Sequence, residues 1–398
     1  ARSLALLEPV LQQALDSLQD VAGPDAPGWQ AWQQRQRQAS AGARSQALPA
    51  QDPGQPVYLS GVARPESPAA QLARQAQAPT LHVRLVLPGW PADVQSAAVA
   101  WVKSRCGELL DWAEAVSARG VVWQVEPLAQ NEDLWTEVDQ HLLRWQREGR
   151  PELLLLLAAD SALSPQVVEH MQARGELFTA QHQVGRMPGE GAAALLLGTS
   201  HWLGLASGEI EAPVSPVALA NAAGGAEVAL DTAVRLWRPL AARRDKSADA
   251  HGRTGHQTLA ALMTQVQGLH HPCTAALHIV SDADHRASRG AELYESVSDV
   301  LPGADPMSSI TRVGQGCGDL GAVGALVPTA LACAWLRSAP PPGDAPAEDP
   351  ESAWQAAPMA LAAHVQASHQ RVLVPLSTWH RVPPPATDAG TAPQALAA

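Results

Sequence analysis

The chain has 398 residues, a formal net charge of −12 and an apolar fraction of 46%. This length can bury a sizeable core, in two domains or in one large pseudo-symmetric domain. No apolar run approaches the roughly 18 to 20 residues that a membrane-spanning helix needs, and lysine and arginine are scattered singly along the chain. We therefore expect neither membrane association of this chain nor nucleic acid as a partner.

The four cysteines lie far apart in the sequence. Such spacing in a long chain does not indicate a disulfide framework, and it is typical of reduced thiols in the cytoplasm. Because the first residue is Ala1, the sequence leaves open that an initiator Met, a signal peptide or an anchor has been removed.

Residues 1–21 carry an amphipathic helical pattern, and residues 22–56 are rich in Gln, Ala, Pro and Gly. We interpret residues 1–55 as a helical or extended N-terminal lead-in. Beyond it, short apolar runs predict strands at 57–62, 81–87, 121–125, 153–159, 192–197, 274–280 and 371–376. Helical periods between them predict helices at 92–118, 133–147, 163–174, 256–268, 287–300 and 319–337.

Strands that alternate with helices are typical of an α/β fold with parallel strands covered on both faces. The polar stretch 240–255 divides the chain near its middle, and 338–352 is a Pro-rich acidic loop. These breaks predict two halves of similar element order, residues 56–245 and 246–382. A flexible tail, residues 383–398, follows.

Residues 187–197 (MPGEGAAALLL) predict a tight glycine-containing turn that leads into a core strand. A buried strand that ends at Asp160 and Ser161, followed by a helix, precedes this turn. In order and spacing the segment 153–198 resembles the β-ketoacyl synthases of the thiolase-like superfamily.

Residues 313–336 (VGQGCGDLGAVGALVPTALACAWL) contain a G-x-G-x-x-G pattern, so a dinucleotide site has to be considered. No second strand and acidic residue follow at the expected distance. The stretch 317–324 is similar to the ketosynthase segment that reads Gly-His-x-x-Gly-Ala-Ala-Gly. Residues 276–295 are similar to the strand, His-Gly-Thr loop and helix of that family, with its acidic residue at Glu292. The resemblance covers roughly residues 56–380 and implies a thiolase-like, five-layered α-β-α-β-α fold built from two pseudo-repeated halves.

The resemblance also implies where a ketosynthase would keep its catalytic thiol and two imidazoles. These places hold Asn131, Ser281 and Gly318. All three catalytic residues would then be missing, and we predict a non-catalytic member of the superfamily. No cofactor is predicted, and no metal either, because no second ligand pair accompanies His270, His271 and Cys273.

Three functions remain open from the sequence. The first is an adaptor that recruits a protein partner such as a type VI secretion effector, by analogy with the type VI lipase adaptors. The second is a non-catalytic partner subunit of a ketosynthase paralogue in polyketide or fatty-acid-type synthesis, where homodimers through a shared sheet are also expected. The third is an enzyme with a relocated site that uses Cys317, His285 and Asp319.

Overall fold

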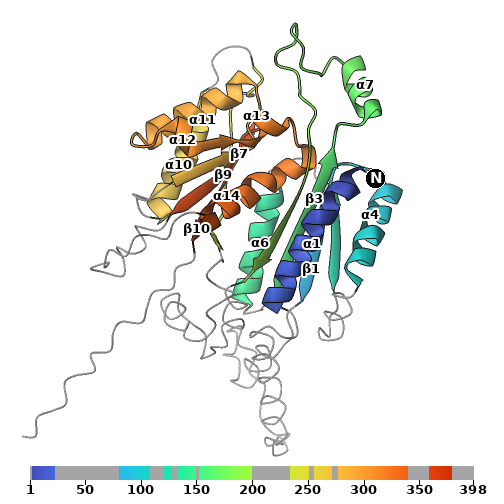
Figure 1. Ribbon diagram of the computed structural model, residues 1–398. Coiled ribbons are helices and arrows are strands. Elements are labelled where there is room, and N and C mark those ends of the chain that lie inside the picture. The colour runs from blue at the N-terminus through green and yellow to red at the C-terminus, as the bar shows by residue number, and fades with distance from the viewer. Residues whose placement is uncertain are drawn as a thin grey trace, which may run out of the picture.

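The computed structural model describes residues 2–22, 80–107, 121–127, 133–148, 152–199, 234–250, 255–270, 277–338 and 358–378. The described helices are α1 (Arg2–Ala22), α4 (Ala92–Arg105), α6 (Asp133–Arg147), α7 (Pro165–Ala173), α10 (Gln257–His270), α11 (Ala287–Val300), α12 (Pro306–Ser309), α13 (Val313–Cys317), the 3₁₀ helix η1 (Gly321–Ala325) and α14 (Val327–Ser338). The described strands are β1 (Leu81–Leu87), β2 (Val122–Pro127), β3 (Leu153–Ser161), β4 (Glu190–Gly198), β5 (Val234–Leu236), β6 (Leu240–Arg243), β7 (Leu277–Ser281), β8 (Ile310–Arg312), β9 (Met359–His364) and β10 (Gln370–Thr378). They form two β-sheets (Figure 1).

The first sheet has the strand order β2-β1-β3-β4. Strand β1 is parallel to β2 and to β3, with Leu85 opposite Leu157, whereas β4 runs antiparallel to β3. The run Leu153–Leu157 is fully apolar and buried. This composition fits a central strand whose two faces are both covered by helices.

The second sheet has the order β5-β10-β9-β7-β8, and β6 also pairs with β10. Strands β8 and β9 are parallel to β7, whereas β10 is antiparallel to β5, β6 and β9. Strands β5 and β6 precede residue 245, the boundary expected from the sequence, and they pair with a strand from the end of the chain.

Three hydrophobic clusters divide the protein into five layers. One cluster joins α1 and α4 to the outer face of the first sheet, and another joins α10 and α11 to the outer face of the second. The third lies between the sheets and contains residues of β1, β3, α6, α14, β9 and β10. Figure 1 shows α6 and α14 between the two sheets. The predicted α-β-α-β-α layering is thus confirmed.

Helix α1 forms part of the outermost layer although residues 23–80 separate it from β1. Its buried face, which includes Leu7, Leu11 and Leu18, packs on β3 and β4. At its first turn Arg2 Nη2 donates to Glu190 Oε1 of β4 at 2.7 Å. In the described parts of the chain, no helix combines the length and apolar character needed to cross a bilayer.

The structure differs from the sequence prediction in three places. The expectation of parallel strands is wrong for β4 and β10, and β9 (MALAAH) was not predicted as a strand. The predicted helix 319–337 begins later and is split into η1 and α14. Gly321, the first residue of η1, has φ +55°, which lies outside the helical range, and Pro328 in the first turn of α14 has no N–H to continue the hydrogen bonds of a helix from η1. The predicted strand 57–62 lies outside the described residues.

Candidate functional site

Ser281 stands where the resemblance places the first imidazole, and it connects two strands of the second sheet. It is the last residue of β7 and is fully buried. Its hydroxyl donates to the carbonyl oxygen of Ala363 on β9 at 2.8 Å and accepts from the backbone N–H of Ala283 at 3.1 Å. The hydroxyl therefore already donates its proton and accepts one hydrogen bond within the protein.

Gly318 stands where the resemblance places the second imidazole, and its backbone requires glycine. Its φ is +76°, a conformation that side chains other than glycine rarely adopt. A Cβ at this position would lie 2.8 Å from the carbonyl oxygens of both Met187 and Pro188. A histidine cannot be placed here unless the loop moves. The backbone N–H groups of Gly318 and Asp319 already donate to the carbonyl oxygens of Gly314 and Met187, at 3.1 and 2.7 Å, which argues against the dinucleotide alternative, where such N–H groups bind phosphate.

Two aromatic side chains, Trp135 and His364, pack between α6 and the end of β9. Trp135, in the first turn of α6, is 0% exposed, and its indole Nε1 donates to the carbonyl oxygen of Ala325 at 2.8 Å. Its ring centroid lies 6.2 Å from that of His364 at the end of β9. These contacts close the space between α6, η1 and the second sheet.

His364 is a buried ionisable residue that the sequence analysis did not single out. It is 0% exposed, and burial lowers its pKa to about 4, so the imidazole is neutral at pH 7. Its Nδ1 lies 3.9 Å from Asp282 Oδ2, while Asp282 Oδ1 accepts from the backbone N–H of Val365 at 2.7 Å. Because it is the last residue of an unpredicted strand, no spacing pattern in the sequence marked it.

Cys317, His285 and Asp319 are not joined by hydrogen bonds in the structure. Cys317 is exposed at the end of α13. The Asp319 carboxylate pairs with Arg186 Nε at 2.7 Å, and the His285 ring stands edge-on to Phe178 with centroids 4.8 Å apart. The three side chains come from one cluster of loops, but no thiol-imidazole-carboxylate chain is assembled there. Asn131 lies outside the described residues.

Glu292 joins α11 to strand β10 and to Arg244, the residue that follows β6. Its buried carboxylate accepts from Arg244 at 2.8 Å and from Arg371 at 2.9 and 2.8 Å. The sequence marked Glu292 through the resemblance, but the two arginines that surround it were not predicted. Among the described residues no group of His, Cys, Asp and Glu could hold a metal ion, and His271 and Cys273 are not among those residues.

Comparison with known proteins gives similarity in structure alone. No protein-family model matches the sequence, and no curated protein matches it either. A ketosynthase from module 6 of the Bacillus subtilis bacillaene synthase is 12% identical with a TM-score of 0.45, covering 76% of this chain and 54% of that one. The noncanonical ketosynthase FabY from P. aeruginosa is also 12% identical, with a TM-score of 0.46 and coverages of 78% and 53%.

The ishigamide ketosynthase/chain length factor is similar over more of its own length. It is 15% identical, with a TM-score of 0.43, and the alignment covers 78% of this chain and 79% of that one. The chain thus spans about half the length of the first and second of these three structures. It is similar to all three in its mixed α/β arrangement.

Proposed function

We propose that this chain is a non-catalytic protein-binding protein with a thiolase-type architecture. The observation that carries the proposal is the geometry at Gly318, where backbone carbonyls leave no room for the imidazole that a ketosynthase would need. The hydroxyl of Ser281 and the ring of Trp135 support it, since both are used in buried internal hydrogen bonds.

The open edge of β4 supports a protein partner of related fold. Among the described strands β4 pairs only with β3. Its sequence after Glu190 consists of Gly, Ala and Leu, and most of it is half-buried, whereas the equally apolar β3 is buried. Edge strands normally carry charges or proline that prevent pairing with another chain, and residues 191–198 contain neither.

Exposed apolar side chains continue this surface beyond the sheet. The segment between β3 and β4, which includes α7, projects away from the layers in Figure 1. It carries Leu163, Val167, Phe178 and Val184, the last being 69% exposed. An apolar edge with exposed apolar neighbours is typical of a protein interface. We therefore place the partner, a second copy or a ketosynthase paralogue, along β4.

The adaptor function predicted from the sequence has less support. An adaptor would be expected to capture a secreted effector through residues 1–55 or through the loop 338–352. Of these, only residues 2–22 and Ser338 are described, and α1 uses its apolar face to cover the first sheet. Recruitment of an effector stays a prediction.

Affinity purification of the tagged chain from its native organism, followed by mass spectrometry and light scattering, tests the proposal. We expect capture of a ketosynthase paralogue, or self-association into a dimer. Val184→Lys, at the 69% exposed residue of the segment between β3 and β4, should weaken the association about tenfold or more, since it places a charge at the proposed interface. Val94→Lys on α4, also at an exposed apolar residue, is the matched control and should leave it unchanged.

An assay of acyl transfer tests the non-catalytic part of the proposal. Incubation with acyl-loaded carrier protein should leave every cysteine unmodified. Stable acylation at Cys317, lost in Cys317→Ala together with condensation activity, would show a relocated enzyme site and overturn the proposal.

A further inference from the structure

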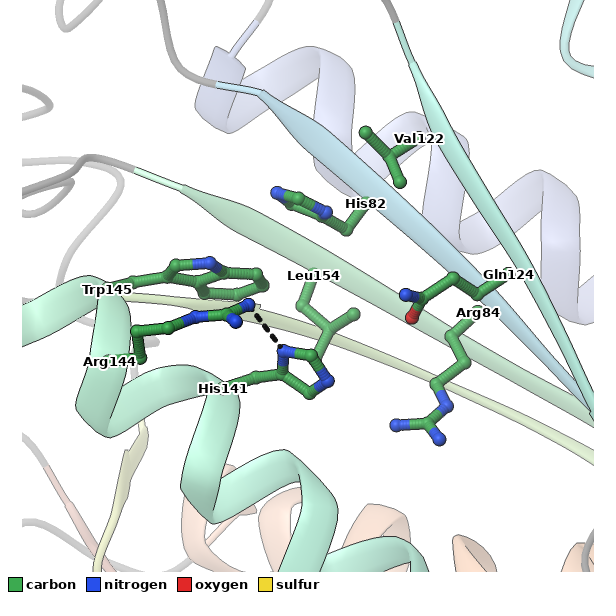
Figure 2. A pocket seen from close by; sticks show the side chains of 8 residues that line it. All are labelled: His82, Arg84, Val122, Gln124, His141, Arg144, Trp145 and Leu154. Atoms are coloured by element: carbon green, nitrogen blue, oxygen red, sulfur yellow. Dashed lines mark hydrogen bonds between the residues drawn. The ribbon is translucent and has the colours of Figure 1, made fainter.

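A cavity of about 210 Å³ lies far from the candidate site, between α6 and the β1–β2 edge of the first sheet. Its lining residues are His82, Arg84, Val122, Gln124, His141, Arg144, Trp145 and Leu154. Figure 2 shows these side chains arranged around one space, with the α6 residues on one side and the strand residues on the other. The cavity opens at the N-terminal ends of the parallel strands, whereas Ser281 lies at the C-terminal end of β7.

Three polar side chains in the cavity have hydrogen-bonding capacity that the described residues leave unused. Arg84 is 1% exposed, and its terminal nitrogen pairs with Glu126 and Glu137, but its Nε–H has no partner. The amide of Gln124 makes no hydrogen bond with any described side chain or backbone group. A buried N–H without a partner costs free energy, so this donor favours a bound acceptor.

His141 supplies a further donor. Arg144 Nη2 lies 3.1 Å from His141 Nδ1, and because a guanidinium can only donate, Nδ1 must accept. The ring proton of the neutral imidazole is therefore on Nε2. Burial is the largest cause of a lowered pKa at His141, and the neighbouring Arg144 charge adds to it, which keeps this tautomer neutral.

Aromatic and aliphatic side chains form the rest of the lining. Trp145 is 2% exposed and stacks on His82 with ring centroids 4.4 Å apart and an interplanar angle of 29°. Val122 and Leu154 complete the apolar wall. Since one water needs roughly 10–15 Å³ of such volume, the cavity admits a small molecule of about ten or more non-hydrogen atoms, and aromatic walls favour a planar one.

We propose that this cavity binds a small planar carboxylate, with its ring or conjugated chain against Trp145 and its carboxylate on the N–H groups of Arg84, Gln124, His141 and Arg144. Three carboxylates lie near the site and do not line the cavity: Glu126 and Glu137 pair with Arg84, and Glu152 pairs with His82 at 3.0 Å. The exposed guanidinium of Arg144 supplies the charge that favours an anion over a neutral acceptor. The inference does not depend on pairing along β4.

Calorimetric titration of the full chain with benzoate tests the proposal, with benzamide and acetate as comparison ligands. Benzoate should bind, benzamide should bind more weakly because it lacks the charge, and acetate should bind more weakly because it lacks the ring. Arg144→Gln should raise the benzoate Kd about tenfold or more, the effect of losing one charge-assisted hydrogen bond. Arg147→Gln, on the same helix but not in the cavity lining, should leave the Kd unchanged.

Gln124→Leu gives a second variant whose effect does not rest on the charge of Arg144. It should also weaken benzoate binding, and circular dichroism should show that the variant is folded. Absence of benzoate binding at millimolar concentration would overturn the proposal. Equal affinity for benzamide or acetate, or equal effects of Arg144→Gln and Arg147→Gln, would overturn it as well.

Discussion

The buried pairing of Glu292 with Arg244 and Arg371 predicts a large loss of stability for Glu292→Gln. Glu292 and Arg371 are 0% exposed and Arg244 is 4% exposed. The amide keeps the volume of the carboxylate but leaves two buried guanidinium groups without their counter-charge. Breaking a buried ion pair costs about 3–5 kcal/mol, which is a large part of a typical folding free energy of about 5–15 kcal/mol.

Urea denaturation followed by circular dichroism measures this loss. The matched control is Glu295→Gln, one turn away on α11, where the carboxylate pairs with His256 and is 33% exposed. An exposed pair contributes at most about 1 kcal/mol, so the control should shift the urea midpoint little. If both variants lower the free energy of unfolding equally, the buried carboxylate does not hold this part of the sheet and the reasoning is refuted.

Three further predictions follow from burial and backbone geometry. Gly318→Ala should destabilise the protein by about 1–3 kcal/mol in thermal unfolding, because an alanine there has a strained backbone. Gly316→Ala, with no atom within 4 Å of its Cβ, should not destabilise it. Equal effects of the two substitutions would contradict the strain expected at Gly318. His364 has a folded pKa of about 4, below its unfolded value. The unfolded state therefore binds the proton first, and roughly 3 kcal/mol of stability should disappear as the pH falls from about 6.5 to 4; His364→Leu should flatten this part of the pH profile. Burial raises the pKa of Cys106 to about 11, so at pH 8 iodoacetamide should modify exposed Cys317 much faster than Cys106, as site-resolved mass spectrometry can check.

The local elements were predictable where one sequence pattern dominates. The helix 133–147 and the strand at 153–159 follow from a 3.6-residue apolar period and from an unbroken leucine run, and the structure has α6 and β3 there. Strand β9 was missed, because MALAAH combines small residues that are also common in helices and becomes a strand through pairing with β7 and β10. Strand direction was also beyond the sequence, since β4 turns antiparallel after a long projecting segment.

The candidate site was likewise predictable only in part. The sequence could place Gly318 and Ser281 through the resemblance, but not the carbonyls of Met187 and Pro188 that surround Gly318, because they come from a distant loop. The lowered pKa of His364 results from its burial between the layers, and no local sequence pattern predicts that burial. The cavity beside Trp145 is likewise lined by side chains from four separate elements, β1, β2, α6 and β3.

The position of α1 has a consequence for how the chain is made. The leucines at positions 7, 11 and 18 leave the ribosome well before β3 and β4, which form the surface they cover and end at Gly198. At synthesis rates of about 5–20 residues per second, the apolar face of this helix stays uncovered for roughly ten to forty seconds. We expect this nascent helix to need a chaperone, and a chain shortened by its first 22 residues to aggregate through the uncovered sheet.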